Sequence, residues 1–139
     1  KRALRCDKLT LATLAATLRL YRTAPDLRAA LPTLRWLTRP LSELEAVGRA
    51  ALPLLRAALG DGFVVELVDT ESEIGSGALP LATVRTKALS VTHARRGPQD
   101  IARLFRAAEP PIIGRIQSGR FLLDLRGAFR ADELVPRTP

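Results

Sequence analysis

The spacing of hydrophobic residues changes once along this chain, and that change most restricts the fold. Between residues 11 and 59 the large apolar side chains recur three or four positions apart, which places them on one face of a helix. From residue 63 the period changes to two, because Phe63, Val65 and Leu67 alternate with Val64, Glu66 and Val68, which is typical of a strand. Helices followed by strands indicate an α+β domain.

Three helical segments are expected before residue 60. The first has an apolar stripe, can be capped by Asp7 or Thr10, and ends at Ala24-Pro25. Its stripe consists of Leu11, Leu14, Leu18 and Tyr21. A short segment follows from Pro25 to Leu31, and a longer helix is predicted over residues 41–59. Pro53 should kink or split that longer helix, because proline removes a backbone hydrogen bond.

The second half of the chain predicts a sheet. Strands are expected at residues 63–68 and 83–91, with a loop at 71–80 between them. A helix should begin at Gly97-Pro98, and residues 112–117 and 120–126 should pair as a hairpin around Ser118-Gly119. The tail, residues 127–139, is expected to fray. We therefore expect one two-layer α+β domain over residues 1–139, with helices covering a largely antiparallel sheet.

Composition narrows the possible functions. The formal net charge is +8, but the arginines are spread along the chain, which argues against a concentrated nucleic-acid surface. Aromatic residues are 4%, too few for a base-stacking sheet. Cys6 is the only cysteine, so we expect no internal disulfide, no metal site and a cytoplasmic setting. No apolar run is long enough for a membrane helix, and the absence of methionine suggests a piece of a longer protein.

The first eight residues form the strongest candidate site. Arg2 and Arg5 are three positions apart, which would put both on one helix face. Two guanidinium groups on one face can bind a phosphate-like anion through paired, charge-assisted hydrogen bonds. The alternative is a solvated basic segment ahead of the first helix.

Other candidates carry weaker signals. Arg115 lies in an apolar strand, so it either faces solvent at an edge or points into a site as an anion ligand. The segment Gly75-Ser76-Gly77 is either a turn or a backbone surface that approaches a ligand. His93 is interpreted as a surface residue, and Cys6 has no histidine nearby in sequence to activate it as a nucleophile.

Several motifs together resemble the bacterial selenocysteine synthase family, the L-seryl-tRNA(Sec) selenium transferases. The most specific motif is Arg2-Ala3-Leu4-Arg5-Cys6-Asp7-Lys8, which continues through residues 9–12 and 16–21. Residues 32–35, 77–80, 112–116, 119–120 and 122–126 also match, in the same order. The resemblance covers nearly the whole chain. Two departures are Cys6, at a position that is commonly aliphatic, and Gly75-Ser76-Gly77, which replaces a run of three glycines.

The resemblance implies a specific fold and activity. The family is a fold-type-I pyridoxal-phosphate enzyme, and this chain resembles its C-terminal small domain, without the large cofactor domain. The cofactor lysine of the family lies upstream, and Lys1, Lys8 and Lys87 do not match it. Arg2 and Arg5 would bind selenophosphate, residues 1–8 would lead into the active site, and this chain alone would be inactive. The full-length enzyme would act on seryl-tRNA(Sec) and assemble from dimers into a larger homo-oligomer.

Two other functions stay open at this point. The chain could be the small domain of another pyridoxal-phosphate lyase or transferase, because the hairpin resembles several such domains. It could also be a basic, non-catalytic RNA-binding module that uses the +8 charge.

Overall fold

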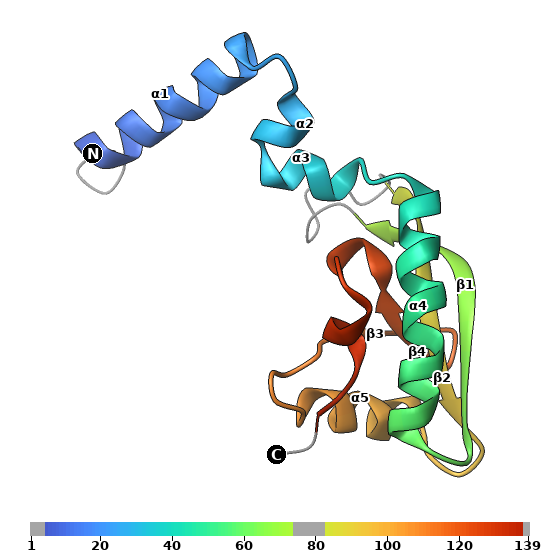
Figure 1. Cartoon of the computed structure of the whole chain (residues 1–139). Helices are drawn as coiled ribbons and strands as arrows, with labels where there is room; N and C mark the ends of the chain where they lie inside the picture. Colours follow the sequence, from blue (N-terminus) through green and yellow to red (C-terminus); the bar gives the residue numbers. More distant parts are fainter. Residues whose placement is uncertain (1–4, 74–82, 138–139) are drawn as a thin grey trace. The chain divides into compact units, whose positions relative to one another are not determined.

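The computed structural model describes residues 5–73 and 83–137, and within them the chain forms two compact units. Unit 1 spans Lys1–Thr38 and unit 2 spans Arg39–Pro139. Figure 1 shows their elements in chain order. In these described ranges no helix is both long enough and apolar enough to cross a membrane.

Unit 1 consists of three helices: α1 (Lys8–Thr23), α2 (Leu27–Ala30) and α3 (Pro32–Leu37). An aspartate caps each of the first two. The Asp7 carboxylate accepts a hydrogen bond from the backbone N–H of Thr10 at 2.8 Å, and Asp26 accepts from Arg28 and Ala29. Pro32 occupies the first position of α3, where its missing N–H costs nothing. The expected helices around residues 11–21 and 25–31 are confirmed, with α3 as a separate third element.

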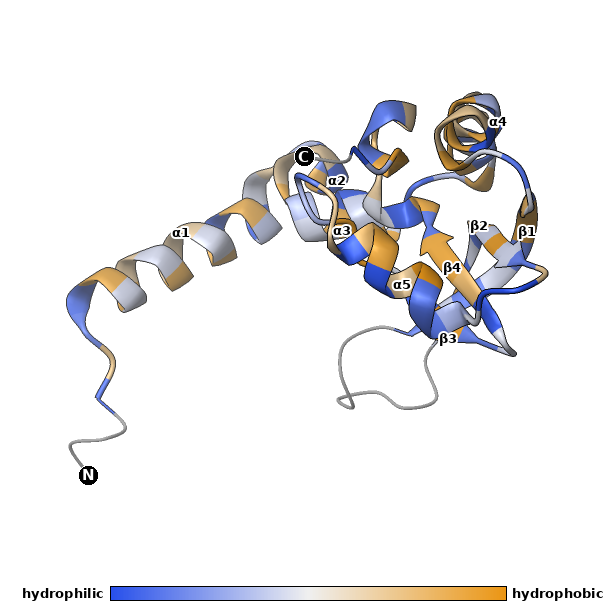
Figure 2. Cartoon of the chain, turned by 90° about the horizontal axis from the view of Figure 1, so that it is seen from below, coloured by the Kyte–Doolittle hydropathy of each residue, from blue (hydrophilic) through white to orange (hydrophobic). Residues whose placement is uncertain are grey.

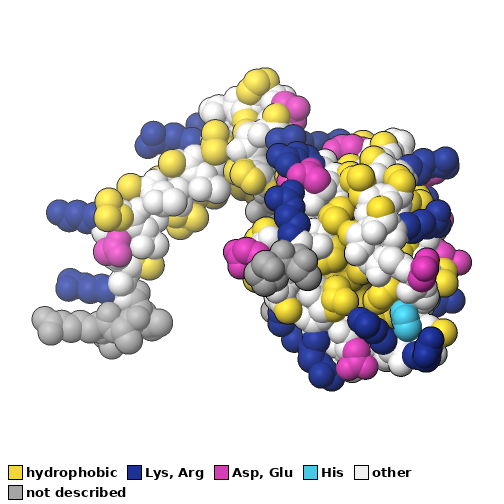
Figure 3. Space-filling model, turned by 60° about the horizontal axis from the view of Figure 1, so that its bottom comes forward, with side chains coloured by type: hydrophobic (Ala, Val, Ile, Leu, Met, Phe, Trp, Pro, Cys, Tyr) yellow, Lys and Arg dark blue, Asp and Glu magenta, His cyan; other side chains and the backbone are white. Residues whose placement is uncertain are grey.

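None of the described residues of unit 1 is buried. Figure 2 shows hydrophobic residues recurring along α1, and Figure 3 shows them on the surface of this helix beside blue Lys and Arg side chains. The helices of unit 1 therefore form without a hydrophobic core of their own.

Unit 2 begins with the long helix α4 (Leu41–Leu59), whose bounds match the prediction. Leu44, Ala51 and Leu55 are fully buried along one face. The helix continues through Pro53 and is not split there. Pro53 lies on the exposed side, where water can hydrate the carbonyl that loses its partner, so the proline is tolerated.

The sheet contains four antiparallel strands in the order β1-β2-β4-β3. The strands are β1 (Phe63–Glu73), β2 (Thr83–His93), β3 (Arg115–Gln117) and β4 (Arg120–Asp124). The β1 strand is longer than predicted, because its full length pairs with β2 from Phe63↔His93 to Glu73↔Thr83. One sheet face is apolar and packs against α4 and α5 (Pro98–Arg106). The predicted α+β fold, with helices on a largely antiparallel sheet, is confirmed.

The β3–β4 hairpin turns at Ser118 and Gly119, which have φ angles of 50° and 72°. Two consecutive left-handed residues match the twist of antiparallel strands, so the predicted hairpin is confirmed. Gly114 precedes β3 and lies against β4. A Cβ atom at this position would lie 2.5 Å from the carbonyl oxygen of Leu122 and 2.5 Å from the ring of Phe121. Only glycine fits this close approach.

The core lies between the sheet and the two helices. Phe105 of α5 packs against Phe121 of β4, with ring centroids 5.0 Å apart. Gly48 lets α4 approach closely, because a Cβ atom there would lie 2.7 Å from methyl groups of Leu67 and Leu125. These contacts hold α4 and α5 on the apolar face of the sheet, and neither helix covers the opposite face.

The structure corrects the expectation of fraying for residues 127–137, while residues 138–139 lie outside the described residues. Two 3-10 helices, η2 (Leu125–Gly127) and η3 (Ala131–Leu134), follow β4, and Leu134 is buried in the core. The backbone N–H of Glu109 donates to the carbonyl of Arg137 at 3.0 Å, which anchors the segment near its end. Pro136 suggested fraying, but one buried leucine and these backbone contacts hold residues 127–137 in place.

Candidate functional site

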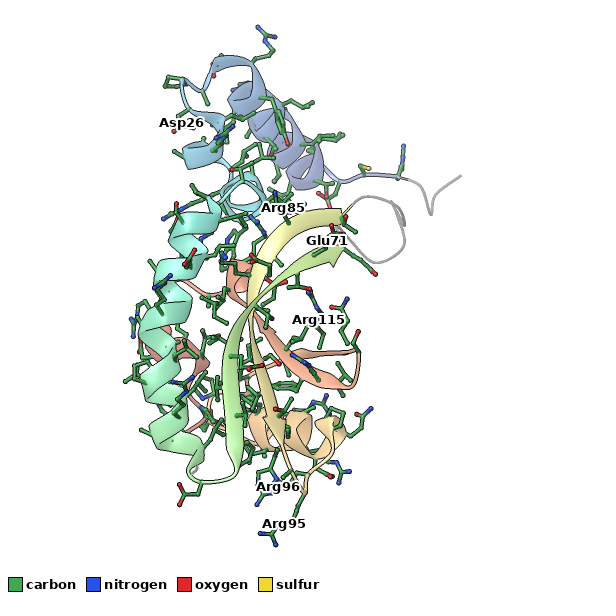
Figure 4. The ribbon with its side chains drawn as sticks, turned by 90° about the vertical axis from the view of Figure 1, so that its right-hand side faces the viewer. Asp26, Glu71, Arg85, Arg95, Arg96 and Arg115 are labelled. Carbon is green, nitrogen blue, oxygen red and sulfur yellow. The ribbon has the colours of Figure 1, made fainter. Side chains whose placement is uncertain are left out.

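Arg115 lies on the sheet face that the helices leave open. Arg115 is the first residue of β3 and pairs with Leu122 of β4. From there its guanidinium reaches residues near the end of β1, at the opposite edge of the strand order. Figure 4 shows Arg115 directed toward the part of the sheet that carries Glu71.

The terminal nitrogens of Arg115 are both engaged. One nitrogen donates to the Asp124 carboxylate at 2.9 Å and to the Ser72 hydroxyl at 3.1 Å. The other donates to the Glu71 carbonyl at 2.7 Å and to the Thr70 hydroxyl at 3.2 Å. A guanidinium has five N–H donors, and these contacts use four of them. Only Nε is left, and it is buried without a hydrogen-bond partner among the described residues.

Asp124 is the acceptor at the centre of this cluster. Its carboxylate accepts from the Thr86 hydroxyl at 2.8 Å and also from the Ser72 hydroxyl. It further accepts from the backbone N–H of Arg126 at 3.0 Å, which caps η2. Asp124 therefore joins β1, β2, β3 and the start of η2 through side-chain hydrogen bonds.

A cavity of about 660 Å³ lies beside this cluster. Glu71, Glu73 and Asp124 line it together with Arg115 and Gln117. Three carboxylates against one guanidinium do not favour an anion, because the repulsion from the acids exceeds the attraction of one paired arginine. An anion would also have to displace the present partners of Arg115. The anion-ligand hypothesis for Arg115 stays a prediction. The contacts favour a structural role, in which Arg115 links β3 to the end of β1.

The other predicted site residues are not brought to this cavity. Arg2 and Gly75-Ser76-Gly77 lie outside the described residues. Arg5 is exposed and lies two residues before the α1 cap, Asp7. Arg5 is not helical, so the expectation that Arg2 and Arg5 share one helix face is wrong at Arg5. Their role in anion binding stays a prediction.

His93, Cys6 and Lys87 have ordinary surroundings. The His93 ring packs edge-on against Phe63 with centroids 4.7 Å apart, and its Nδ1 accepts from the Arg95 backbone N–H. Cys6 is exposed. The Lys87 ammonium donates to Asp69 at 2.9 Å, and this hydrogen bond, with the nearby negative charges, raises the pKa of Lys87. A lysine that is held protonated is a poor amine nucleophile.

Sequence reasoning missed two buried arginines, Arg39 and Arg126. Arg39 is 5% exposed and donates to the carbonyls of Leu125, Arg126 and Ala128. It also forms an ion pair with Glu43 at 3.0 Å. Arg126 is 8% exposed and donates to the carbonyls of Arg39 and Arg85. Burial, and secondarily the charge of Arg39, lower the pKa of Arg126, while Asp124 opposes that shift.

These two arginines serve the fold. They join the start of α4 to the segment after β4 through backbone carbonyls, which no spacing in the sequence reveals. Within residues 5–73 and 83–137, no three side chains of the His, Cys, Asp and Glu types gather as metal ligands would.

Comparisons with known proteins agree on one family. A family model described as SelA, L-seryl-tRNA selenium transferase, matches residues 1–129. An L-seryl-tRNA(Sec) selenium transferase of Methylocella silvestris is 48% identical over 128 residues, and one of Edwardsiella ictaluri is 47% identical over 134 residues. Another, of Klebsiella pneumoniae, is 48% identical over 129 residues. Each alignment covers 91% of this chain but only 27–28% of the relative, so the chain spans little more than a quarter of their length.

Proposed function

Since this chain belongs to the L-seryl-tRNA selenium transferase family, we propose that it is the C-terminal small domain of a selenium transferase. The full-length protein would convert seryl-tRNA(Sec) to selenocysteinyl-tRNA(Sec), with selenophosphate as the selenium donor. The observation that carries this proposal is the family match over residues 1–129, which includes the Arg2-Ala3-Leu4-Arg5 motif. The names of the relatives supply the tRNA substrate.

The described residues offer no site for the pyridoxal phosphate that the family resemblance implies. Such a cofactor needs a lysine that can react as a neutral amine, and Lys87 is held protonated by Asp69 and Glu45. Lys8 is the first residue of α1 and is exposed. We therefore place the cofactor in the part of the full-length protein outside this chain, and we assign no chemical step to these residues through it.

The contribution of this domain would be to bind the selenium donor. Selenophosphate is a phosphate-like oxyanion, and two guanidinium groups can hold its oxygens while directing the selenium toward the acceptor. Residues 1–38 carry eight Lys and Arg residues and only two acids. Both acids, Asp7 and Asp26, act as helix caps. The local potential is therefore positive and favours an incoming anion.

We further propose a cytoplasmic enzyme that forms a homo-oligomer built from dimers. The cytoplasmic setting is supported by the aminoacyl-tRNA substrate in the names of the relatives, and the oligomer is what the family resemblance implies. The partners of this domain would be seryl-tRNA(Sec), selenophosphate and further copies of the same protein.

Replacement of either arginine in the full-length protein tests this proposal. Arg2→Ala or Arg5→Ala should lower selenium transfer at least about tenfold at saturating selenophosphate, because a charge-assisted hydrogen bond contributes roughly 1.5–3 kcal/mol. Lysine at either position should restore little activity, since it carries the charge without the planar group. The melting temperature should hardly change, because Arg5 is exposed and precedes α1.

Arg28→Ala provides the matched control. Arg28 is an exposed arginine of α2 in the same basic unit, so its loss changes the net charge equally without touching the motif. Full activity of the Arg28 variant beside weak activity of the other two would support a specific anion site. If both motif variants keep full activity, the proposed selenophosphate role of Arg2 and Arg5 is lost.

A further inference from the structure

Helix α1 carries an exposed apolar face, here named the α1 stripe and formed by Leu11, Leu14, Leu18 and Tyr21. Their spacing of three, four and three residues places them on one side of the helix. The exposed fractions of these four residues are 54–55%, which is high for large apolar side chains that share one face. Single exposed leucines are ordinary, whereas four in a row along one helix indicate a contact surface.

The α1 helix also lacks support of its own. None of its 16 residues is buried. Three of its threonine hydroxyls, those of Thr13, Thr17 and Thr23, donate back to the carbonyl four residues earlier, an arrangement that slightly weakens and bends helices. Helices of roughly this length are marginal in water unless an amphipathic face is packed. The α1 stripe is therefore the surface whose burial would stabilise this helix.

The charges on α1 indicate the chemistry of the partner surface. At about 100° per residue, Lys8, Arg19 and Arg22 fall together along one flank of the stripe. Helix α1 contains no acidic residue, and no ion pair links these three cations to any described residue. A complementary surface would be an apolar groove with carboxylates along one edge.

The length of the relatives indicates where such a surface lies. This chain spans only 27–28% of them, so most of the polypeptide in such a protein lies outside residues 1–139. We propose that the α1 stripe docks into an apolar groove, edged by carboxylates, in that remaining part of the full-length protein. The proposal has a second half: docking would hold Arg2 and Arg5 at the active site. This second half rests on the proposed function.

The chain geometry connects the two halves of the proposal. Arg5 is three residues before the first residue of α1, and an extended chain spans at most about 3.6 Å per residue. Once α1 is docked, Arg5 can move only within roughly 11 Å of the helix start. Arg5 therefore stays close to whatever surface receives the stripe, and Arg2 stays within roughly 22 Å of the helix start, wherever unit 2 lies.

Hydrogen exchange measured on α1 tests the docking. The amides of residues 12–23 should exchange at least about tenfold more slowly in the full-length protein than in this chain alone, because packing suppresses local opening. In the full-length protein, Leu14→Asp or Leu18→Asp should abolish that protection. Ala16→Asp is the matched control, since Ala16 is exposed on the opposite side of the helix and its variant should keep the protection.

Two results would overturn the docking. One is equal exchange of α1 in the full-length protein and in this chain alone. The other is protection of α1 in this chain alone that rises with protein concentration, because a second copy would then be the occupant.

Selenium transfer by the same variants separates the two halves. Leu14→Asp should reduce transfer as strongly as Arg5→Ala does, while Ala16→Asp should not. Lost protection with unchanged transfer would overturn the positioning of the arginines. If Arg2→Ala and Arg5→Ala are fully active while α1 remains protected, the donor-binding role fails and the docking stands.

Discussion

Arg115 shows how one residue can join strands that do not pair. Strands β1 and β3 form the two edges of the sheet, yet the Arg115 guanidinium contacts Thr70, Glu71 and Ser72 of β1. The sheet twist that brings the end of β1 over β3 leaves polar groups facing each other, and these groups need partners. Arg115 and Asp124 provide them.

We therefore expect Arg115 to matter for stability. Arg115→Ala should lower the free energy of unfolding by about 1–3 kcal/mol, because it leaves the partly buried Asp124 carboxylate without its cation. The control is Arg120→Ala, whose ion pair with Glu66 is 3.6 Å long and largely exposed, so its loss should cost less than about 1 kcal/mol. Urea unfolding of both variants measures the difference. Equal costs would mean that the Arg115 cluster is no more than a surface ion pair.

At the scale of the elements, the two long helices are stabilised in different ways. Helix α4 buries Leu44, Ala51 and Leu55 against the sheet, and Arg39 ties its start to the carbonyls of residues 125, 126 and 128. Helix α1 buries none of its residues and depends on its cap, Asp7. Helix α1 should therefore respond to changes that leave α4 intact.

The helical content of α1 should depend on pH through Asp7. The hydrogen bond from the Thr10 backbone N–H lowers the pKa of Asp7. A lowered folded-state pKa means that the stabilisation is present above the unfolded-state value of about 3.9 and is lost as the pH falls through the folded-state value. Helicity followed by circular dichroism from pH 7 to pH 2 should therefore decrease below about pH 4.

Asp7→Asn is the control for this pH dependence. Asparagine caps a helix about as well as aspartate but does not titrate, so the variant should keep its helicity at neutral pH and lose the acid step that Asp7 causes. The difference between the two titrations isolates the cap from other carboxylates such as Glu45, whose pKa is lowered by Arg49 and Lys87. Identical titrations would show that protonation of Asp7 does not govern α1.

At the scale of the whole chain, stability resides in unit 2. All residues of the hydrophobic core belong to residues 39–139, and unit 1 has no buried residue in its described part. A folded unit without a core contributes little to cooperative unfolding and opens at low cost.

Removal of residues 1–36 should therefore leave unit 2 folded. Calorimetry of residues 37–139 should give a melting temperature within about 4 °C of that of the intact chain, since a change of 1 kcal/mol shifts a domain of this size by roughly that much. The shortened chain keeps Leu37 and Thr38, so its new amino terminus is not placed on the buried Arg39. A decrease of more than about 10 °C would show that unit 1 stabilises unit 2.

Most of the secondary structure could be predicted from the sequence, because it depends on local spacing. The helix at 41–59, the helix after Gly97 and the turn at Ser118-Gly119 follow from hydrophobic periodicity, a proline at the first helical turn and left-handed turn residues. The family resemblance was also carried by contiguous motifs, and the match over residues 1–129 confirms it. The proposed donor-binding pair, Arg2 and Arg5, was also found from a contiguous sequence motif.

Only the tertiary structure decided which charged side chains are buried and which apolar ones are exposed. Arg39 and Arg126 donate to carbonyls of residues between 41 and 89 positions away, and no local pattern distinguishes them from solvated arginines. Leu134 anchors a tail that its prolines suggested would fray. The leucines of α1 are the opposite case, because they are apolar and yet exposed. Their spacing predicts a helix but does not predict whether another part of the protein packs on it. Periodicity depends on neighbours along the chain, whereas burial depends on residues that folding brings together.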